Sequence, residues 1–200
     1  MCSCENPTEA VETLPSIKTL YFPSKEQISR FTSDSTTTDL ADFVTFSEYL
    51  EVAQDKACNW KSNLITFKDD DINYRVLSYT ECPERRNFGC YFSTIFINIE
   101  NDSILEYHEA SQKLSRLKQH LLNLTNKEYN FKESNQLKNL VISITYSEDN
   151  PITNFKNTLI QITQTISKIE KSQKIHIPYY LYVGTNFMPP PPPPPFPKNE

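Results

Sequence analysis

A strand–helix–strand pattern between Leu137 and Val183 constrains the fold of this chain more than any other stretch. Apolar side chains first alternate with their neighbours, then recur every three or four positions after Asn150-Pro151, and then alternate again. A period of two is typical of a strand with one buried face, and a period of about 3.6 is typical of a helix. The three apolar sets are Leu140, Ile142, Ile144 and Tyr146; Leu159, Ile162, Ile166 and Ile169; and Ile175, Ile177, Tyr179, Leu181 and Val183.

Length and composition indicate one folded domain with a tail at each end. Of the 200 residues, 38% are hydrophobic, which is below the roughly 45–50% of an average globular domain. Residues 1–38 are rich in Ser, Thr, Pro and acidic side chains, so we expect a disordered N-terminal tail. We expect a single α+β domain over residues 39–187, followed by a polyproline tail over residues 188–200.

The apolar spacing predicts further helices and strands inside this domain. Helices are expected near residues 42–57, 103–124 and 158–172, and strands over residues 64–67, 72–79 and 90–99. Trp60 follows the first of these helices, and we expect it to seal that helix against the core. The predicted architecture is a largely antiparallel sheet that is covered by the three helices.

The last strand, from Ile175 to Val183, is predicted to lie at an edge of the sheet. Pro178 has no N–H to donate to a neighbouring strand, which confines it to an edge strand or a bulge. An exposed edge can accept a strand from another protein. The residues predicted to contact a partner in this way are Ile175, Ile177, Tyr179 and Leu181.

Seven consecutive prolines near the end of the chain form a second predicted partner site. Such a run holds a polyproline II helix about 22 Å long, at roughly 3.1 Å per residue. Preformed helices of this kind bind aromatic grooves, as in profilin, SH3 and WW domains. The residues concerned are Pro189, Pro190, Pro191, Pro192, Pro193, Pro194 and Pro195.

Motifs of common enzymes are absent from the sequence. Gly89 and Gly184 are its only glycines, so it lacks the glycine-rich loops that bind nucleotide phosphates. His108 and His120 would point about 120° apart around the predicted helix, and no zinc-type His pair occurs. We therefore expect no cofactor, no metal ion and no enzymatic activity.

The five cysteines provide one alternative to this expectation. Arg85-Arg86 lies between Cys82 and Cys90, and neighbouring cations lower the pKa of a thiol, as in cysteine-dependent enzymes. The simpler interpretation is that all five cysteines are free thiols of a protein from a reducing compartment.

Charge and hydropathy restrict the partners and the compartment. The net charge of −5, without a basic face, argues against nucleic-acid binding. The sequence has no apolar run near 18 residues and no secretory signal pattern, so we expect no membrane partner and a cytoplasmic or nuclear location.

Two parts of the sequence resemble a known family. Residues 96–105, Phe-Ile-Asn-Ile-Glu-Asn-Asp-Ser-Ile-Leu, and the segments 140–149 and 159–181 are similar to the small fourth-type proteasome assembly chaperones. The resemblance implies a non-enzymatic α/β chaperone that pairs with a sister chaperone and holds proteasome α-subunits during ring assembly. It also implies a strand–turn–strand at residues 96–105, where the apolar spacing predicts the start of the helix over 103–124.

The leading hypothesis is therefore a non-enzymatic protein-interaction or assembly factor, such as a proteasome assembly chaperone acting as a heterodimer. The alternative is an adaptor whose polyproline run binds profilin, SH3 or WW domains, and the third hypothesis is the cysteine-dependent enzyme.

Overall fold

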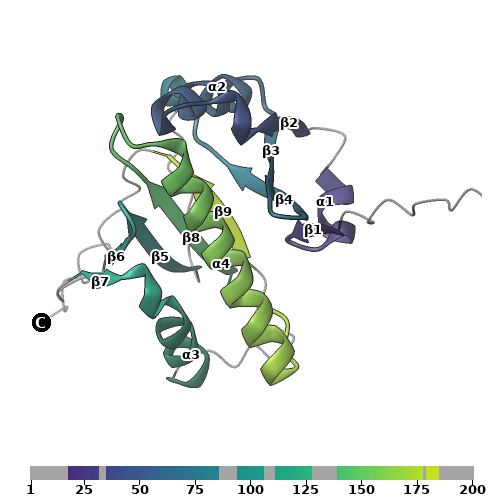
Figure 1. Cartoon of the computed structure of the whole chain (residues 1–200), viewed down its shortest axis with the longest axis vertical. Helices are drawn as coiled ribbons and strands as arrows, with labels where there is room; N and C mark the ends of the chain where they lie inside the picture. Colours follow the sequence, from purple (N-terminus) through teal and green to yellow (C-terminus); the bar gives the residue numbers. More distant parts are fainter. Residues whose placement is uncertain are drawn as a thin grey trace, which may run out of the picture.

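The computed structural model describes residues 18–31, 35–85, 94–105, 111–127, 139–177 and 179–184 (Figure 1). Its strands are β1 (Lys18–Phe22), β2 (Ser35–Asp39), β3 (Ser62–Asp69), β4 (Ile72–Tyr79), β5 (Thr94–Glu100), β6 (Ser103–Leu105), β7 (Gln112–Lys113), β8 (Asn139–Thr145) and β9 (Tyr179–Val183). Its α-helices are α1 (Lys25–Phe31), α2 (Phe46–Cys58), α3 (Leu117–Lys127) and α4 (Ile152–Gln173), and short 3-10 turns are η2 (Leu40–Asp42), η3 (Pro83–Arg85) and η4 (Leu114–Arg116).

All the strands join one mixed sheet. The order is β2-β3-β4-β9-β8-β5-β6-β7, and β1 pairs with β4 beside this path. The pairs β1–β4, β2–β3, β4–β9, β9–β8 and β8–β5 are parallel, whereas β3–β4, β5–β6 and β6–β7 are antiparallel. The α+β class is confirmed, but the largely antiparallel sheet is wrong. The physical reason is that α4 is a crossover connection, which returns the chain to the same end of the sheet and makes β8 and β9 parallel.

The helices α2, α3 and α4 cover one face of the sheet with a single apolar core. Figure 1 shows α4 running across β8 and β9, as the spacing in the sequence predicts. The buried side chains of α4 are spaced at three and four residues, which gives the helix one apolar stripe. The helix α2 begins with a capping box, in which Thr45 Oγ1 accepts from Glu48 N and Glu48 Oε2 accepts from Thr45 N.

The opposite face, called here the far face, is covered over β3 and β4 by α1. Ile28 of α1 packs on Leu64 and Leu77, which are paired across the β3–β4 ladder and point away from the main core. The predicted disorder is therefore wrong for residues 18–31 and 35–38, which form β1, α1 and most of β2. This segment is too polar to fold alone, but it is ordered by pairing with more apolar strands. The strand β1 pairs with β4, and β2 pairs with β3.

The helix predicted over residues 103–124 is wrong at residues 103–105 and 112–113, which form β6 and β7, while residues 106–110 lie outside the described part of the chain. Asn101 and Asp102 both have positive φ values, 45° and 62°, as in the two-residue turns that join tight hairpins. The chain therefore folds back and pairs β6 with β5, and Ile104 is fully buried. The helical spacing holds only from Leu114 onward, in η4 and α3.

The strand β9 is not an edge strand. It pairs with β4 on one side and with β8 on the other, so both sets of its backbone groups have neighbours. Ile177, Tyr179 and Leu181 are buried in the core, and Ile175 packs partly buried against it. The edge prediction is wrong because β9 begins at Tyr179, so every residue of its ladder has an N–H to donate.

Two local predictions around α2 are also wrong. The side chain of Trp60 is 74% exposed, so it does not seal the helix against the core. Cys58 at the end of α2 and Cys82 after β4 form a disulfide, so these two cysteines are not free thiols. The spacing in the sequence could not reveal this pair, because the β3–β4 hairpin brings together two residues that lie 24 positions apart.

Candidate functional site

Three tyrosines from two strands gather on the far face, beside the part that α1 covers. In β9, Tyr179, Leu181 and Val183 point into the main core, so the alternate residues Tyr180 and Tyr182 point the other way. In β4, Tyr74 and Val76 point into the same core, and Tyr79 therefore lies on the far face with Leu77. We call Tyr79, Tyr180 and Tyr182 the tyrosine cluster.

The rings of the cluster are held in a defined arrangement. Those of Tyr79 and Tyr180 stand edge to face, with centroids 5.8 Å apart. Tyr182 lies opposite Tyr79 in the β4–β9 register, and its hydroxyl donates to Glu81 Oε2 at 3.2 Å. Tyr180 is 40% exposed, while Tyr79 and Tyr182 are partly buried. The cluster therefore presents aromatic surface to solvent from a rigid sheet.

Burial keeps the phenol of Tyr79 neutral, and two cations lie beside the cluster. Burial, and then the neighbouring phenol of Tyr180, raise the pKa of Tyr79 above its usual value. Next to the cluster, the ring of Tyr21 in β1 has Lys25 Nζ at 5.8 Å and the Arg75 guanidinium at 5.9 Å from its centroid. The surface is thus aromatic, carries phenol hydroxyl groups, and has Lys25 and Arg75 on one side and the Glu81 carboxylate at Tyr182.

A surface of this composition is suited to binding rather than to bond making. Tyrosine offers a flat apolar ring and a hydroxyl at low cost in side-chain entropy, which is why it is enriched at protein interfaces. The cluster can stack on apolar or proline side chains and can donate hydrogen bonds to carbonyl oxygens.

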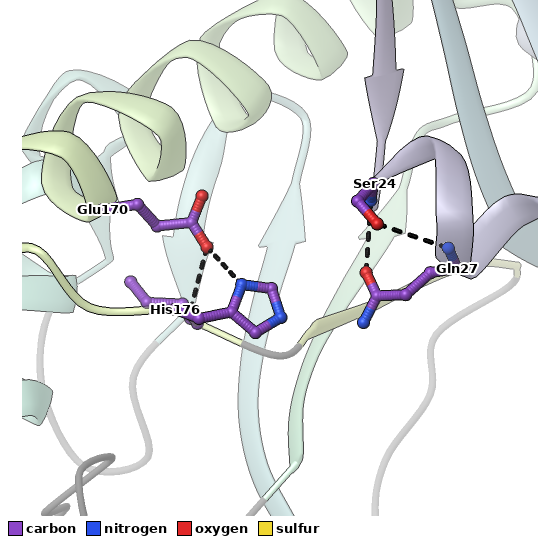
Figure 2. Close-up of polar contacts among 5 residues, drawn as sticks. Ser24, Gln27, Glu170 and His176 are labelled. Carbon is purple, nitrogen blue, oxygen red and sulfur yellow. Dashed lines mark hydrogen bonds and ion pairs between the residues drawn. The ribbon is translucent and has the colours of Figure 1, made fainter.

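A second group of polar side chains consists of one set at the end of α4 and one at the start of α1, drawn together in Figure 2. Figure 2 shows His176 and Glu170 on one side and Ser24 and Gln27 on the other. Glu170 Oε1 contacts His176 Nδ1 at 2.9 Å and accepts from Ile177 N at 2.9 Å. Ser24 N donates to Gln27 Oε1 at 3.1 Å, and Gln27 N donates to Ser24 Oγ at 3.3 Å.

These contacts hold two chain segments in place. The backbone of Glu170 also binds the loop before β9. Its carbonyl oxygen accepts hydrogen bonds from Lys174 N and Ile175 N. Ser24 and Gln27 form a reciprocal cap at the start of α1. His176 and Ser24 face one another in Figure 2, but each is hydrogen-bonded within its own pair. The two pairs therefore have a structural role, each in its own segment of the chain.

The buried hydroxyl of Tyr179, near Glu170, has no hydrogen-bond partner within the described part of the chain. The side chain of Tyr179 is buried in the core below the loop, and its phenol oxygen has no such partner there. Burial, and then the negative charge of Glu170, hold the pKa of this phenol above its usual range. Tyr179 therefore stays neutral and packs as a large core side chain.

A third polar cluster is buried between α2 and the strands β2, β3 and β4. Asn63 Nδ2 donates to the hydroxyl of Tyr49 at 3.0 Å, and that hydroxyl lies 3.4 Å from Ser78 Oγ. Thr38 Oγ1 donates to Asn63 Oδ1 and itself receives a hydrogen bond from Lys56 Nζ. Burial raises the pKa of Tyr49 to about 12 and lowers that of Lys56. The chain of bonds fixes β2 on β3 beneath α2.

The predicted site residues have different outcomes. Ile177, Tyr179 and Leu181 are buried in the core. Their predicted contact with a partner required an exposed edge strand, and β9 lies between β4 and β8 instead. The proline run Pro189–Pro195 and the residues Cys90 and His108 lie outside the described residues. Cys82 is bonded to Cys58, which removes the thiol that the enzyme hypothesis needs at that position. The cysteine-dependent enzyme would therefore have to use Cys90.

Two kinds of site are absent from the described residues. Within them, no three side chains of His, Cys, Asp or Glu are grouped so as to hold a metal ion. Among the helices that the structure describes, none combines the length and the apolar character needed to cross a membrane.

The predicted partner site and the candidate site share the last strand, but the prediction relied on an exposed edge, whereas the tyrosine cluster lies on one face of the strand. The alternation in β9 was visible, and it places Tyr180 and Tyr182 on the face opposite Leu181. One signal in the sequence could have revealed the cluster. The alternate positions of this strand, which do not face the core, hold Tyr180 and Tyr182 where charged side chains are more usual. Tyr79 could not be joined to them, because the β4–β9 pairing links distant parts of the sequence.

Comparison with known proteins gives no match: no family model, no curated protein and no solved structure is significantly similar to this chain.

Proposed function

We propose that this protein is a non-enzymatic protein-interaction and assembly factor that binds its partner through the tyrosine cluster. The observation that carries the proposal is the exposed, edge-to-face pair of Tyr79 and Tyr180 on a rigid sheet. A large aromatic side chain that is 40% exposed loses apolar contact with water when a partner covers it, and tyrosine is among the residues that contribute most at interfaces.

A proteasome assembly chaperone is the specific assembly factor that we propose. The resemblance to the fourth-type chaperones implies a strand–turn–strand at residues 96–105, and β5 and β6 form such a hairpin. It also implies a later strand, helix and strand, to which β8, α4 and β9 correspond. Both points support the proposal, and the partners would be a sister chaperone and proteasome α-subunits. The cytoplasm or the nucleus is the compartment that this function requires.

Affinity purification of the tagged full-length protein from the cells that express it tests this function. The variants to compare are Tyr180→Ala and Val52→Ala, whose original side chains are 40% and 38% exposed on opposite layers of the molecule. We expect the wild type and Val52→Ala to recover proteasome α-subunits and a second small chaperone, and Tyr180→Ala to lose them. Equal recovery of these partners by all three proteins would contradict binding through the cluster, and recovery of none by the wild type would contradict the chaperone function.

An adaptor is the second candidate, because the sequence holds seven consecutive prolines at Pro189–Pro195. In this case the partner would be profilin or an SH3 or WW domain, and it would bind the proline run rather than the sheet. Replacing each of these prolines by Gly or Ser would then abolish recovery of the partner, whereas Tyr180→Ala would leave it intact.

A further inference from the structure

We infer that the tyrosine cluster is the docking surface for the chain's own proline run, Pro189–Pro195, which covers the cluster until a partner replaces it. The inference rests on the proposed function, because it assigns a regulatory occupant to the same surface. Two observations lead to it: the chemistry of the cluster, and the point at which the chain leaves the sheet.

The chemistry of the two surfaces is complementary. Each proline lacks an N–H, so a proline run presents ring faces and carbonyl acceptors only. The tyrosine cluster presents rings that can stack on proline, and the hydroxyl groups of Tyr79 and Tyr180 can donate to those carbonyls, whereas the hydroxyl of Tyr182 donates to Glu81. The neutral state of Tyr79, whose pKa is raised by burial and by Tyr180, preserves its hydroxyl as a donor.

The exit point of the tail lies next to the cluster. Gly184 N donates to the carbonyl oxygen of Ile144 at 3.2 Å, and the Gly184 oxygen accepts from Thr145 Oγ1 at 2.9 Å. A Cβ at Gly184 would stand 2.8 Å from Cε1 of Tyr182, so the backbone passes directly against this ring. The tail therefore starts in contact with one of the three tyrosines.

The reach of the chain matches the distance to be covered. Residues 185–188 link Gly184 to the first proline, and four residues span at most about 14 Å when extended. The way back from Val183 to Tyr180 along β9 is about 10 Å, at roughly 3.3 Å per residue. Seven prolines in polyproline II geometry span about 22 Å, so a tail that reverses direction after Gly184 would be long enough to cover the whole cluster.

Tethering favours this occupant over the same sequence in solution. A short flexible linker gives a tethered segment an effective concentration in the millimolar range. Weak contacts between three tyrosines and a proline run are then sufficient to keep the surface mostly occupied. A partner that offers a larger complementary surface would displace the tail without any change in the sheet.

Fluorescence anisotropy with a labelled peptide of residues 187–197 tests the inference on full-length proteins. The wild type is compared with a variant in which Gly or Ser replaces each proline from Pro189 to Pro195, and circular dichroism confirms that both are folded. We expect the variant to bind the peptide and the wild type to bind it about tenfold more weakly, since its own tail competes at an effective concentration in the millimolar range.

Adding a second substitution to the proline-free variant locates the binding surface. Tyr180→Ala should weaken peptide binding by about five- to tenfold, as expected for the loss of one central aromatic contact, whereas Val52→Ala should leave it unchanged. Equal binding by the wild type and the proline-free variant would overturn the inference, since it would mean that the tail does not occupy the surface. Absence of binding by the proline-free variant, or binding insensitive to Tyr180→Ala, would overturn it as well.

The peptide experiment contains no partner protein, so its failure is distinct from a failure of the proposed function. Loss of α-subunit recovery by Tyr180→Ala would still support the function if the peptide did not bind. Peptide binding at the cluster would likewise stand if the α-subunits were recovered independently of Tyr180.

Discussion

The phenol rings of Tyr79 and Tyr180 meet edge to face on the far face of the sheet, with centroids 5.8 Å apart and ring planes at 61°. One ring belongs to the β3–β4 hairpin and the other to the last strand, and the parallel β4–β9 ladder brings them together. The sheet therefore assembles the tyrosine cluster from two parts of the chain that fold around the same core. This relation lets stability measurements separate the surface residues of β9 from its core residues.

Neighbouring substitutions in β9 should have very different effects on stability. Leu181 is buried in the main core, so Leu181→Ala should lower the free energy of unfolding by about 2–5 kcal/mol. Tyr180→Ala should cost only about 1 kcal/mol, because it removes a partly exposed ring and one aromatic contact. Urea unfolding followed by circular dichroism measures both values. Similar losses for the two variants would contradict the assignment of opposite faces.

The disulfide between Cys58 and Cys82 should stabilise the fold. It closes a loop of 24 residues, and the chain-entropy model assigns about 3 kcal/mol to a loop of this size. The double substitution Cys58→Ser and Cys82→Ser should lower the free energy of unfolding by about this amount under non-reducing conditions. Dithiothreitol should lower that of the wild type similarly and leave the double variant unchanged, which is the matched control.

The same disulfide also tests the compartment. Disulfides persist in oxidising compartments, whereas the sequence predicts the cytoplasm or the nucleus. Alkylation of the denatured protein taken directly from cells, without reductant, leaves Cys58 and Cys82 unmodified in mass spectra if the bond is closed in the cell, and this result would contradict the cytoplasmic or nuclear location that the chaperone proposal requires. Alkylation of both would mean that the bond is open in the cell.

Tyr49 should make the fold sensitive to alkaline pH. Burial raises its pKa from about 10 in an unfolded chain to about 12 in the folded protein. Folding favours the neutral phenol, so its contribution to the free energy of unfolding is fully present below about pH 10. As the pH rises from about 10 to about 12, the free energy of unfolding should fall by roughly 2–3 kcal/mol.

The variant Tyr49→Phe should weaken this dependence while keeping the ring. At neutral pH it should cost about 1–2 kcal/mol, because Asn63 Nδ2 loses its acceptor. Unfolding free energies at pH 8 and pH 11 provide the measurement. An identical pH dependence in the wild type and Tyr49→Phe would show that this phenol does not contribute.

A side chain at Gly184 should force the ring of Tyr182 to move. An alanine Cβ would lie 2.8 Å from the ring, and relief of this overlap should cost about 1–3 kcal/mol. Tyr182→Ala removes the ring, so Gly184→Ala should cost much less in that background. A double-mutant cycle by thermal unfolding measures the coupling, and additive losses would contradict the contact.

The sequence by itself determined those elements whose signal is local. The alternation and helical spacing between Leu140 and Val183 specified β8, α4 and β9, because side-chain periodicity follows from the geometry of one strand or one helix. The strands predicted over residues 64–67 and 72–79 were specified in the same way and correspond to β3 and β4. At Asn101-Asp102 two local signals disagreed, and the turn prevailed because it lets Ile104 enter the core.

Tertiary structure alone decided which strands are neighbours, and with them the candidate site. The place of β9 between β4 and β8 depends on pairing between distant strands, and no local pattern encodes a parallel ladder. This placement buries Leu181 and leaves Tyr180 beside Tyr79 on the far face. The order of residues 18–31 has the same origin, because β1 and α1 gain their stability from β4 and from the Leu64–Leu77 pair.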